Sequence, residues 1–184
     1  MLRDISLHIM DLCENSIKAK ANKVEVFIKA DFEKDELIVR ISDNGVGMDE
    51  EMLKNVQDPF TTGRTTRNVG LGIPFFKLAC EMTGGNIEIW SKQNEGTCLV
   101  GKMVISHIDR LPLGNIGQTY QSLILAKPEN EYVLGLESNE KSIKISTEDI
   151  KKELEGVPIT NFSILEWIKT YVDTKVLEIF GDNI

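Results

Sequence analysis

The sequence contains little cysteine and no long apolar run. Three cysteines, Cys13, Cys80 and Cys98, occur among its 184 residues, and no two of them have Cys-x-x-Cys spacing. This excludes a disulfide framework and a zinc-ribbon site, so we expect free thiols in a reducing compartment. No apolar segment reaches the ~18 residues that a membrane-spanning helix needs, and the N-terminus lacks a signal-peptide pattern. We therefore expect a cytoplasmic protein that does not bind membranes.

Basic residues are scarce relative to acidic ones. The chain has 21 lysines and arginines against 29 aspartates and glutamates, which gives a net charge of −8. A surface that binds nucleic acid needs clustered lysine and arginine, so we expect no nucleic-acid partner. A chain of 184 residues is long enough for one good core, or for a core with a small appendage.

A carboxylate followed by two glycines marks the most informative segment, which is Asp43-Asn44-Gly45-Val46-Gly47-Met48. Alternating apolar residues over 37–41 predict a strand, so Asp43 lies at the rim of a sheet. There its carboxylate can accept a hydrogen bond from an exocyclic amine such as that of adenine. Gly45 and Gly47 permit positive φ and close approach of a flat ring, above an apolar floor that includes Met48. An ordinary turn before a short helix explains the same residues equally well.

Upstream, residues 4–20 have a helical pattern with Asp4 as the expected N-cap. The apolar stripe of this helix consists of Ile5, Ile9, Leu12, Ser16 and Ala19. A second stripe, at spacings of three and four, consists of His8, Asp11, Asn15 and Lys18. Its asparagine offers an amide oxygen to a cation such as Mg²⁺, and its aspartate can accept a proton. A solvated helix face is the alternative.

Downstream, a long polar loop over 58–69 leads into Gly70-Leu71-Gly72 and an apolar helix predicted over 75–82. Glycines at a helix start expose backbone N–H groups, and the helix dipole adds partial positive charge, which together favour a phosphate. The side chains that would close over a polyphosphate as a lid are Thr61, Thr62, Arg64 and Arg67. Predicted strands over 86–92 and 98–105, joined at Gly96-Thr97, supply a second wall.

In this order, the motifs resemble those of the GHKL ATP-binding superfamily, which includes gyrase B, the large heat-shock chaperone, sensor histidine kinases and the mismatch-repair protein MutL. Residues 11–15 are similar to the N box, 43–47 to the G1 box, 60–72 to the F box, lid and G2 box, and 96–97 to the last nucleotide-contacting turn. The resemblance covers about residues 1–105. It implies a Bergerat-type α/β (α+β) two-layer sandwich, in which helices cover one face of a mixed, mostly antiparallel sheet.

The resemblance also implies that ATP and Mg²⁺ are the ligands. Asp43 would bind the adenine amine, Gly47 would pack beneath the ring, and Thr97 would join the water network around them. Asn15 would hold Mg²⁺, and Lys18 stands where histidine kinases often have a basic residue near the phosphates. The backbone N–H groups that would hold the phosphates are those around Gly70, Leu71 and Gly72.

Asp11 departs from the family pattern. Hydrolytic members and anti-sigma serine kinases usually have glutamate here, and an aspartate is shorter by one carbon–carbon bond, about 1.5 Å. Misplacing a catalytic group by about 1 Å can cost roughly a hundredfold in rate. The sequence therefore predicts ATP binding more firmly than rapid hydrolysis.

Two functional classes remain open. The first is phosphoryl transfer from ATP to a separate protein in bacterial regulation, with Asp11 as the base. The second is a binding module that ATP gates through the lid, with slow hydrolysis. The chain also resembles small stand-alone members, including bacterial ones associated with iron hydrogenase genes. With only His8 and His107 present, we expect no phosphoacceptor domain, and His8 is expected to pack.

After residue 105 the family motifs end. Residues 106–117 predict a linker or crossover, and 118–184 form an α-β-β-α-α extension with no assigned role. Its predicted elements are a helix over 118–126, strands over 131–137 and 141–146, a helix over 147–154 capped by Thr147, and a helix over 161–180. The extension could recognise a protein partner, form a homodimer or pack against the nucleotide domain.

Overall fold

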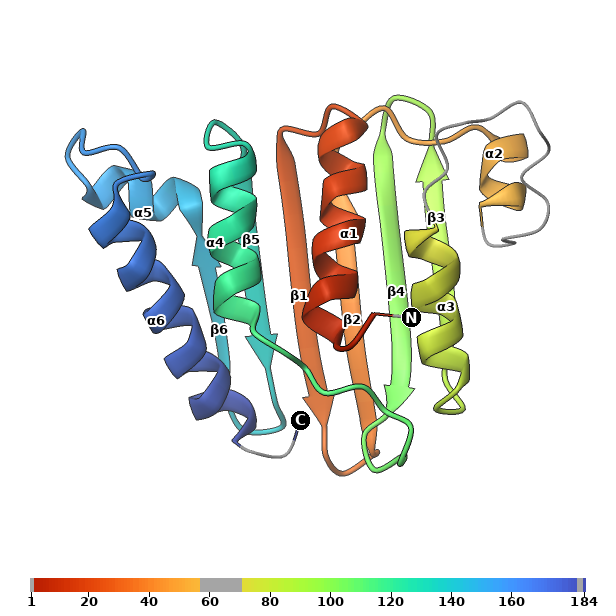
Figure 1. Ribbon diagram of the computed structural model, residues 1–184. Helices are drawn as coiled ribbons and strands as arrows, with labels where there is room; N and C mark the ends of the chain where they lie inside the picture. Colours follow the sequence, from red (N-terminus) through yellow and green to blue (C-terminus); the bar gives the residue numbers. More distant parts are fainter. Residues whose placement is uncertain (1, 57–70, 182–183) are drawn as a thin grey trace.

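The computed structural model describes residues 2–56, 71–181 and 184 (Figure 1). The helices among them are α1 (Ile5–Lys18), α2 (Glu50–Asn55), α3 (Gly72–Glu81), α4 (Ile116–Ala126), α5 (Thr147–Glu153) and α6 (Phe162–Phe180). The strands are β1 (Lys23–Asp31), β2 (Glu36–Asp43), β3 (Asn86–Lys92), β4 (Gly96–Val104), β5 (Glu131–Glu137) and β6 (Ser142–Ser146). No helix in these ranges is long and apolar enough to cross a membrane.

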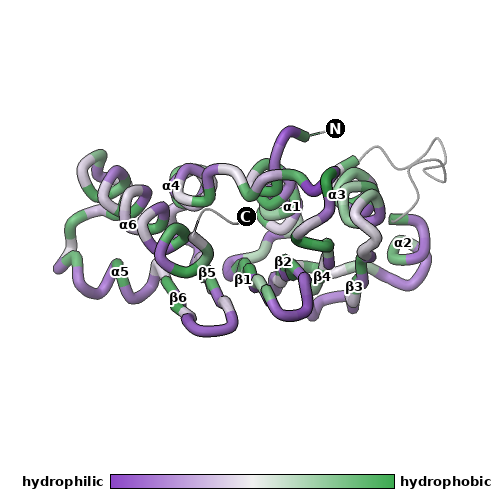
Figure 2. Tube along the Cα trace, turned by 90° about the horizontal axis from the view of Figure 1, so that it is seen from below, coloured by the Kyte–Doolittle hydropathy of each residue, from purple (hydrophilic) through white to green (hydrophobic). Residues whose placement is uncertain are grey.

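The strands form one mixed sheet in the order β3-β4-β2-β1-β5-β6. Neighbouring strands are antiparallel except β1 and β5, which run parallel. Helices α1, α3, α4 and α6 lie on one face of the sheet, and the described residues place no helix on the other face (Figures 1 and 2). This confirms the predicted two-layer sandwich.

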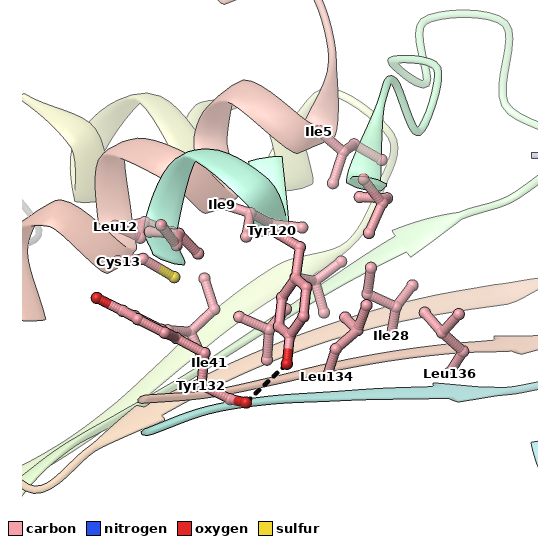
Figure 3. Packing of buried hydrophobic residues seen from close by; sticks show 14 of the residues in the cluster. Ile5, Ile9, Leu12, Cys13, Ile28, Ile41, Tyr120, Tyr132, Leu134 and Leu136 are labelled. Carbon is pink, nitrogen blue, oxygen red and sulfur yellow. Dashed lines mark hydrogen bonds between the residues drawn. The ribbon is translucent and has the colours of Figure 1, made fainter. Parts of the chain in front are cut away.

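The core lies between the helix layer and the sheet. On β1 and β2 every second side chain is buried, as expected for strands with one covered face. Helix α1 contributes Ile5, Ile9 and Leu12 to this core, and α4 contributes Tyr120 (Figure 3). The Tyr120 hydroxyl donates a hydrogen bond to the carbonyl oxygen of Tyr132 at 2.8 Å. Burial of this apolar side holds α1 over the middle of the sheet and fixes where its polar side points.

Helix α1 is capped as predicted, because Asp4 Oδ1 accepts a hydrogen bond from the Leu7 N–H at 2.9 Å. The predicted cap of α5 was wrong. Ser146 is the N-cap, and its hydroxyl oxygen accepts from the Glu148 N–H at 3.2 Å. Thr147 is instead the first helical residue, and its Oγ1 accepts from the Tyr132 N–H at 2.9 Å. The threonine thus fastens the start of α5 to β5.

Helix α3 begins at Gly72, three residues before the predicted start. Pro74 stands in its first turn, where the missing N–H removes no intrahelical hydrogen bond and the fixed φ suits a helix. The strand predicted over 98–105 likewise begins earlier, at Gly96. Both shifts lengthen elements toward the predicted nucleotide site.

The C-terminal segment continues the sheet. Strand β5 runs beside β1 over its whole length, from the Lys23–Glu131 pair to the Lys29–Glu137 pair. The crossover before it is tied to the start of α1 by backbone hydrogen bonds from Ile5 to Pro112 at 3.0 Å and from Ser6 to Leu113 at 2.9 Å. The core therefore extends past residue 105, where the predicted nucleotide-binding motifs end.

Candidate functional site

A cavity of about 450 Å³ lies between α1, the loop after β2, α2, and the first residues of α3 and β4. Of the predicted site residues, the cavity is lined by Asn15, Lys18, Asp43, Gly47, Met48 and Thr97. Its other lining residues are mostly apolar and include Leu12, Ile41, Val46, Ile73 and Leu99. Its volume and apolar character match those of small-molecule sites, which place a few polar groups within mainly hydrophobic walls.

The Asp43 carboxylate is fixed by two hydrogen bonds. Its Oδ2 accepts from the Ser16 hydroxyl at 2.7 Å, and its Oδ1 accepts from the Gly45 N–H at 2.8 Å. Asp43 is the last residue of β2 and stands directly opposite Thr97 of β4. Because each carboxylate oxygen can accept more than one hydrogen bond, the oriented group can still accept from a ligand.

A serine of β3 connects the other polar groups of the site. The Ser91 hydroxyl oxygen accepts from the Met48 N–H at 2.8 Å and lies 2.9 Å from Thr97 Oγ1. It also donates to the Gly96 carbonyl oxygen at 3.0 Å. These contacts tie the loop after β2 to the β3–β4 turn and fix one wall of the cavity.

The two glycines of the loop serve its packing. Gly47 has φ +63, and a Cβ there would lie 2.0 Å from the Lys92 carbonyl oxygen. Gly45 does not line the cavity, and a Cβ there would lie 2.7 Å from the Ala19 carbonyl oxygen. The lack of a side chain at Gly45 and Gly47 therefore lets the loop pack against the backbone of Ala19 and Lys92, in addition to any approach of a ring at Gly47.

At one end of the cavity, polar side chains of α1 meet the start of α3. A Cβ at Gly72 would lie 2.3 Å from Asp11 Oδ2 and 3.4 Å from Asn15 Nδ2, so both side chains lie against this glycine. Leu71 precedes the helix and is 53% exposed. The first N–H groups of α3, the amide of Asn15 and the carboxylate of Asp11 therefore share one corner.

Lys18 lies at the rim of the cavity. Its ammonium is 3.5 Å from Glu14 Oε2, with the two side chains 68% and 45% exposed. An exposed pair one helical turn apart contributes little stability, so this lysine can leave its partner at small cost. Of the remaining predicted residues, Thr61, Thr62, Arg64, Arg67 and Gly70 lie outside the described residues.

Two ionisable side chains of α1 lie beneath the site. Burial raises the pKa of the Cys13 thiol, and the nearby charge of Asp43 raises it further, so this cysteine stays protonated. His8 is fully buried between α1 and α3, with its ring 5.7 Å from that of Phe76. Burial lowers the pKa of His8, and neither ring nitrogen has a hydrogen-bond partner among the described residues.

Ser16 and Ser91 were not predicted as site residues. The sequence placed Ser16 in the apolar stripe of α1, because only the fold reveals its hydrogen bond to an aspartate 27 positions away. A hydroxyl within an otherwise apolar stripe was the available signal. Ser91 stands in the predicted 86–92 strand, where alternation alone gives no sign of its three contacts.

Comparison with known proteins adds family evidence. The profile of the family described as histidine kinase-, DNA gyrase B-, and HSP90-like ATPase matches residues 3–107. The chain is 29% identical to the CAI-1 autoinducer sensor kinase/phosphatase CqsS of Vibrio cholerae, over 48% of this chain and 13% of that protein. It is 33% identical to the sensor protein DegM of a Bacillus species, over 50% of this chain and 24% of that protein. The chain thus spans less than a quarter of the length of these relatives.

A solved structure shares the fold. The N-terminal domain of a DNA repair protein superposes with a TM-score of 0.56 at 15% identity, and the match covers 78% of this chain and 52% of that one. This coverage extends beyond the 3–107 region that the family profile matches. Part of the C-terminal segment therefore has a structural counterpart in that domain.

Proposed function

The chain belongs to the histidine kinase-, DNA gyrase B- and HSP90-like ATPase family, and from this premise we propose that it transfers the terminal phosphate of ATP to a separate protein. The observation that carries the proposal is the corner at Gly72, where Asp11 and Asn15 lie against the start of α3. In this corner Asn15 lines the cavity, and Asp11 and the first residue of α3 lie next to it.

The adenine end is the part around Asp43. The carboxylate accepts a hydrogen bond from the exocyclic amine, while Ser16 and Gly45 keep it aligned. Met48 and Leu99 are among the apolar residues that bury the ring. A carboxylate can accept but not donate, so this end favours adenine over a base that presents a carbonyl oxygen there.

The phosphate end is the corner at Gly72. N–H groups at the start of α3 hold phosphate oxygens, with the N–H groups of Gly70 and Leu71 preceding them in the chain. Asn15 would hold Mg²⁺, because its amide oxygen is a suitable ligand and Mg²⁺ is commonly held by few protein ligands together with substrate phosphates. The ion would neutralise charge on the phosphates.

In this proposal Asp11, whose carboxylate lies against Gly72, acts as the base. A hydroxyl oxygen of the partner forms a bond to the terminal phosphorus, and the bond from that phosphorus to the bridging oxygen breaks, so ADP leaves with that oxygen. The Asp11 carboxylate accepts the hydroxyl proton. Phosphoryl transfer depends mainly on positioning and charge stabilisation. Asp11 can therefore serve as the base if the partner places its hydroxyl within reach of the carboxylate.

The test uses γ-labelled ATP and Mg²⁺ with the purified protein and lysate of its source cells. Label should appear on another protein, and Asp11→Asn should reduce transfer at least ~hundredfold while ATP affinity stays nearly unchanged. Asp109→Asn, a surface variant with the same change of charge, should behave as the parent protein. Transfer that persists in Asp11→Asn would exclude Asp11 as the base.

The shorter side chain at Asp11 favours a second candidate function, in which ATP gates binding of a partner and hydrolysis only resets the protein. In this case label is released as free phosphate or stays on bound ATP. Asp43→Asn should then weaken ATP binding and the partner response together. A partner response that persists after ATP binding is lost would exclude the gating mechanism.

A further inference from the structure

A second hollow lies at the other end of the sheet, far from the ATP cavity. It measures about 500 Å³ and is formed by β6, α5 and α6. We call it the α5–α6 groove. The residues that line it are Lys144, Ile145, Ser146, Asp149, Ile150, Glu153, Leu154, Ser163, Ile164, Trp167 and Tyr171. Strand β6 ends the sheet order, so its outer edge pairs with no strand of the described residues (Figure 1).

The wall on α6 is aromatic and exposed. Trp167 and Tyr171 stack with ring centroids 5.3 Å apart and planes inclined by 13°. Lys175 lies 5.4 Å from the centroid of Tyr171, so this pair already holds one cation. Trp167 nevertheless remains 55% exposed. An indole offers the strongest cation–π site among side chains, and this one is open to a ligand.

The wall on α5 is acidic. Asp149 Oδ1 is 3.4 Å from the ammonium of Lys152, and both of these side chains are largely exposed. Glu153 has no ion-pair partner among the described residues. The single amine of the lining belongs to Lys144, so the carboxylates of Asp149 and Glu153 outnumber it. The interior of the groove therefore attracts a positive charge.

The floor between these walls is aliphatic and includes Ile150, Leu154 and Ile164. A ligand that fits this arrangement has an apolar stem that ends in a flat cation. The stem would cover the floor, and the cation would lie between the indole and a carboxylate. Arginine combines these properties, because its guanidinium stacks on aromatic faces and bonds carboxylates in a fixed geometry.

We propose that the α5–α6 groove binds an arginine side chain presented by an extended segment of a partner protein. The guanidinium packs on the open face of Trp167 and pairs with Glu153. The segment runs past the free edge of β6, where backbone N–H and C=O groups can bond its main chain. This surface is separate from the ATP cavity and binds its partner whether or not phosphate is transferred.

The chain provides its own reporter for the test. It has two tryptophans, and Trp90→Phe leaves Trp167 as the single indole. In that background, the tripeptide acetyl-Leu-Arg-Leu-amide is titrated against Trp167 fluorescence. The matched peptide has citrulline, an uncharged isostere, in place of arginine. The arginine peptide should give a saturable change, and the citrulline peptide should bind about tenfold more weakly or worse.

Two variants test whether Glu153 is the carboxylate that pairs with the guanidinium. Glu153→Gln should weaken binding of the arginine peptide about tenfold, since it removes the carboxylate partner. Glu155→Gln makes the same change two residues away, outside the groove lining, and should have no effect. Circular dichroism should show an unchanged fold in both variants. Equal binding of the two peptides, or equal affinities of the two variants, would overturn the proposal.

A second copy of this chain is the competing occupant. If it covered the groove, Trp167 emission would change with protein concentration in the absence of peptide. Sedimentation would then show a dimer that Glu153→Gln leaves intact, and this outcome would also overturn the proposal. A monomer with concentration-independent emission and a saturable response to the arginine peptide supports it.

Discussion

Ser16 holds the carboxylate that the proposed adenine contact depends on. Its hydroxyl is buried, and it donates to Asp43 Oδ2 at 2.7 Å. Without this hydrogen bond, Asp43 keeps only the bond from the Gly45 N–H and can rotate. Ser16→Ala should therefore weaken ATP binding by about tenfold, the order expected for a hydrogen bond to a charged group. Isothermal titration calorimetry measures the change directly.

Ser6→Ala is the matched control on the same helix. Ser6 is also buried and donates to an aspartate, Asp4, at 2.7 Å, but it lies at the opposite end of α1. Its removal should cost stability and leave ATP affinity unchanged. Equal losses of ATP affinity in the two variants would mean that the helix as a whole, and not the alignment of Asp43, governs binding.

His8 should make stability depend on pH. Burial lowers its pKa in the folded state, while nearby Asp11 and Asp4 on the same helix oppose this shift. The unfolded chain therefore binds the proton more readily, so protonation near pH 6.5 favours unfolding. Stability should fall as pH drops through about 6.5, and His8→Leu should remove most of this dependence. Urea unfolding at pH 7.5 and 5.5 provides the measurement.

His107, the other histidine, serves as the control. Its side chain is 37% exposed, so His107→Gln is the matched removal of an imidazole outside the buried core. If His107→Gln removes the dependence of stability on pH and His8→Leu does not, the buried ring of His8 is not the cause of that dependence.

For helices and strands, the sequence predicted local features more reliably than contacts between segments that are far apart in the chain. The bounds predicted for β3 and β5 and the Asp4 cap of α1 were confirmed, because alternation and capping act within a few residues. No strand was predicted where β1 lies, although Val24, Val26 and Ile28 alternate there. The parallel pairing of β1 with β5 joins segments about 108 positions apart, and nothing in either segment specifies it.

The same distinction applies to the site. The ordered motifs identified six residues that line the cavity, because turns and helix faces have local signatures. The hydrogen bonds that Ser16 and Ser91 make depend on which elements become neighbours in the fold. A sequence pattern thus predicts residues that line one cavity better than it identifies the residues that hold the cavity rigid.

The loop after β2 should not tolerate a side chain at Gly47. With φ +63 and a Cβ position 2.0 Å from the Lys92 carbonyl oxygen, Gly47→Ala must displace the β3–β4 turn. Gly84 also has positive φ, but nothing lies within 4 Å of its Cβ position. Gly84→Ala should therefore lower the free energy of unfolding only by the cost of placing an alanine at positive φ, about 1–2 kcal/mol. Gly47→Ala should lose at least that much again in urea unfolding, together with ATP affinity. Equal losses of stability in the two variants would show that the loop accommodates an alanine at Gly47 without additional strain.

For the whole molecule, the sheet is continuous where the family motifs end. Strand β1 lies between β2 and β5, and buried side chains from both sides of this boundary belong to one cluster. Helix α4 packs against α1 and α6, with the Gly117 N–H donating to Asp173 Oδ1 at 3.0 Å. A fragment of residues 1–107 would expose the edge of β1 and the flank of α1. It should lack a cooperative unfolding transition and bind ATP far more weakly than the full chain.

Urea unfolding and ATP titration of this fragment, beside the full chain, check the expectation. The comparison is informative because every residue of the proposed ATP site lies before residue 107, so a loss of affinity must come from the fold and not from a missing contact. A cooperative fragment with full ATP affinity would instead show that β5, α4 and α6 form an appendage. The α5–α6 groove would then belong to a unit that folds apart from the ATP site. A fragment that fails to fold would show that the ATP site depends on β5, α4 and α6, so that the ATP cavity and the α5–α6 groove belong to one folding unit.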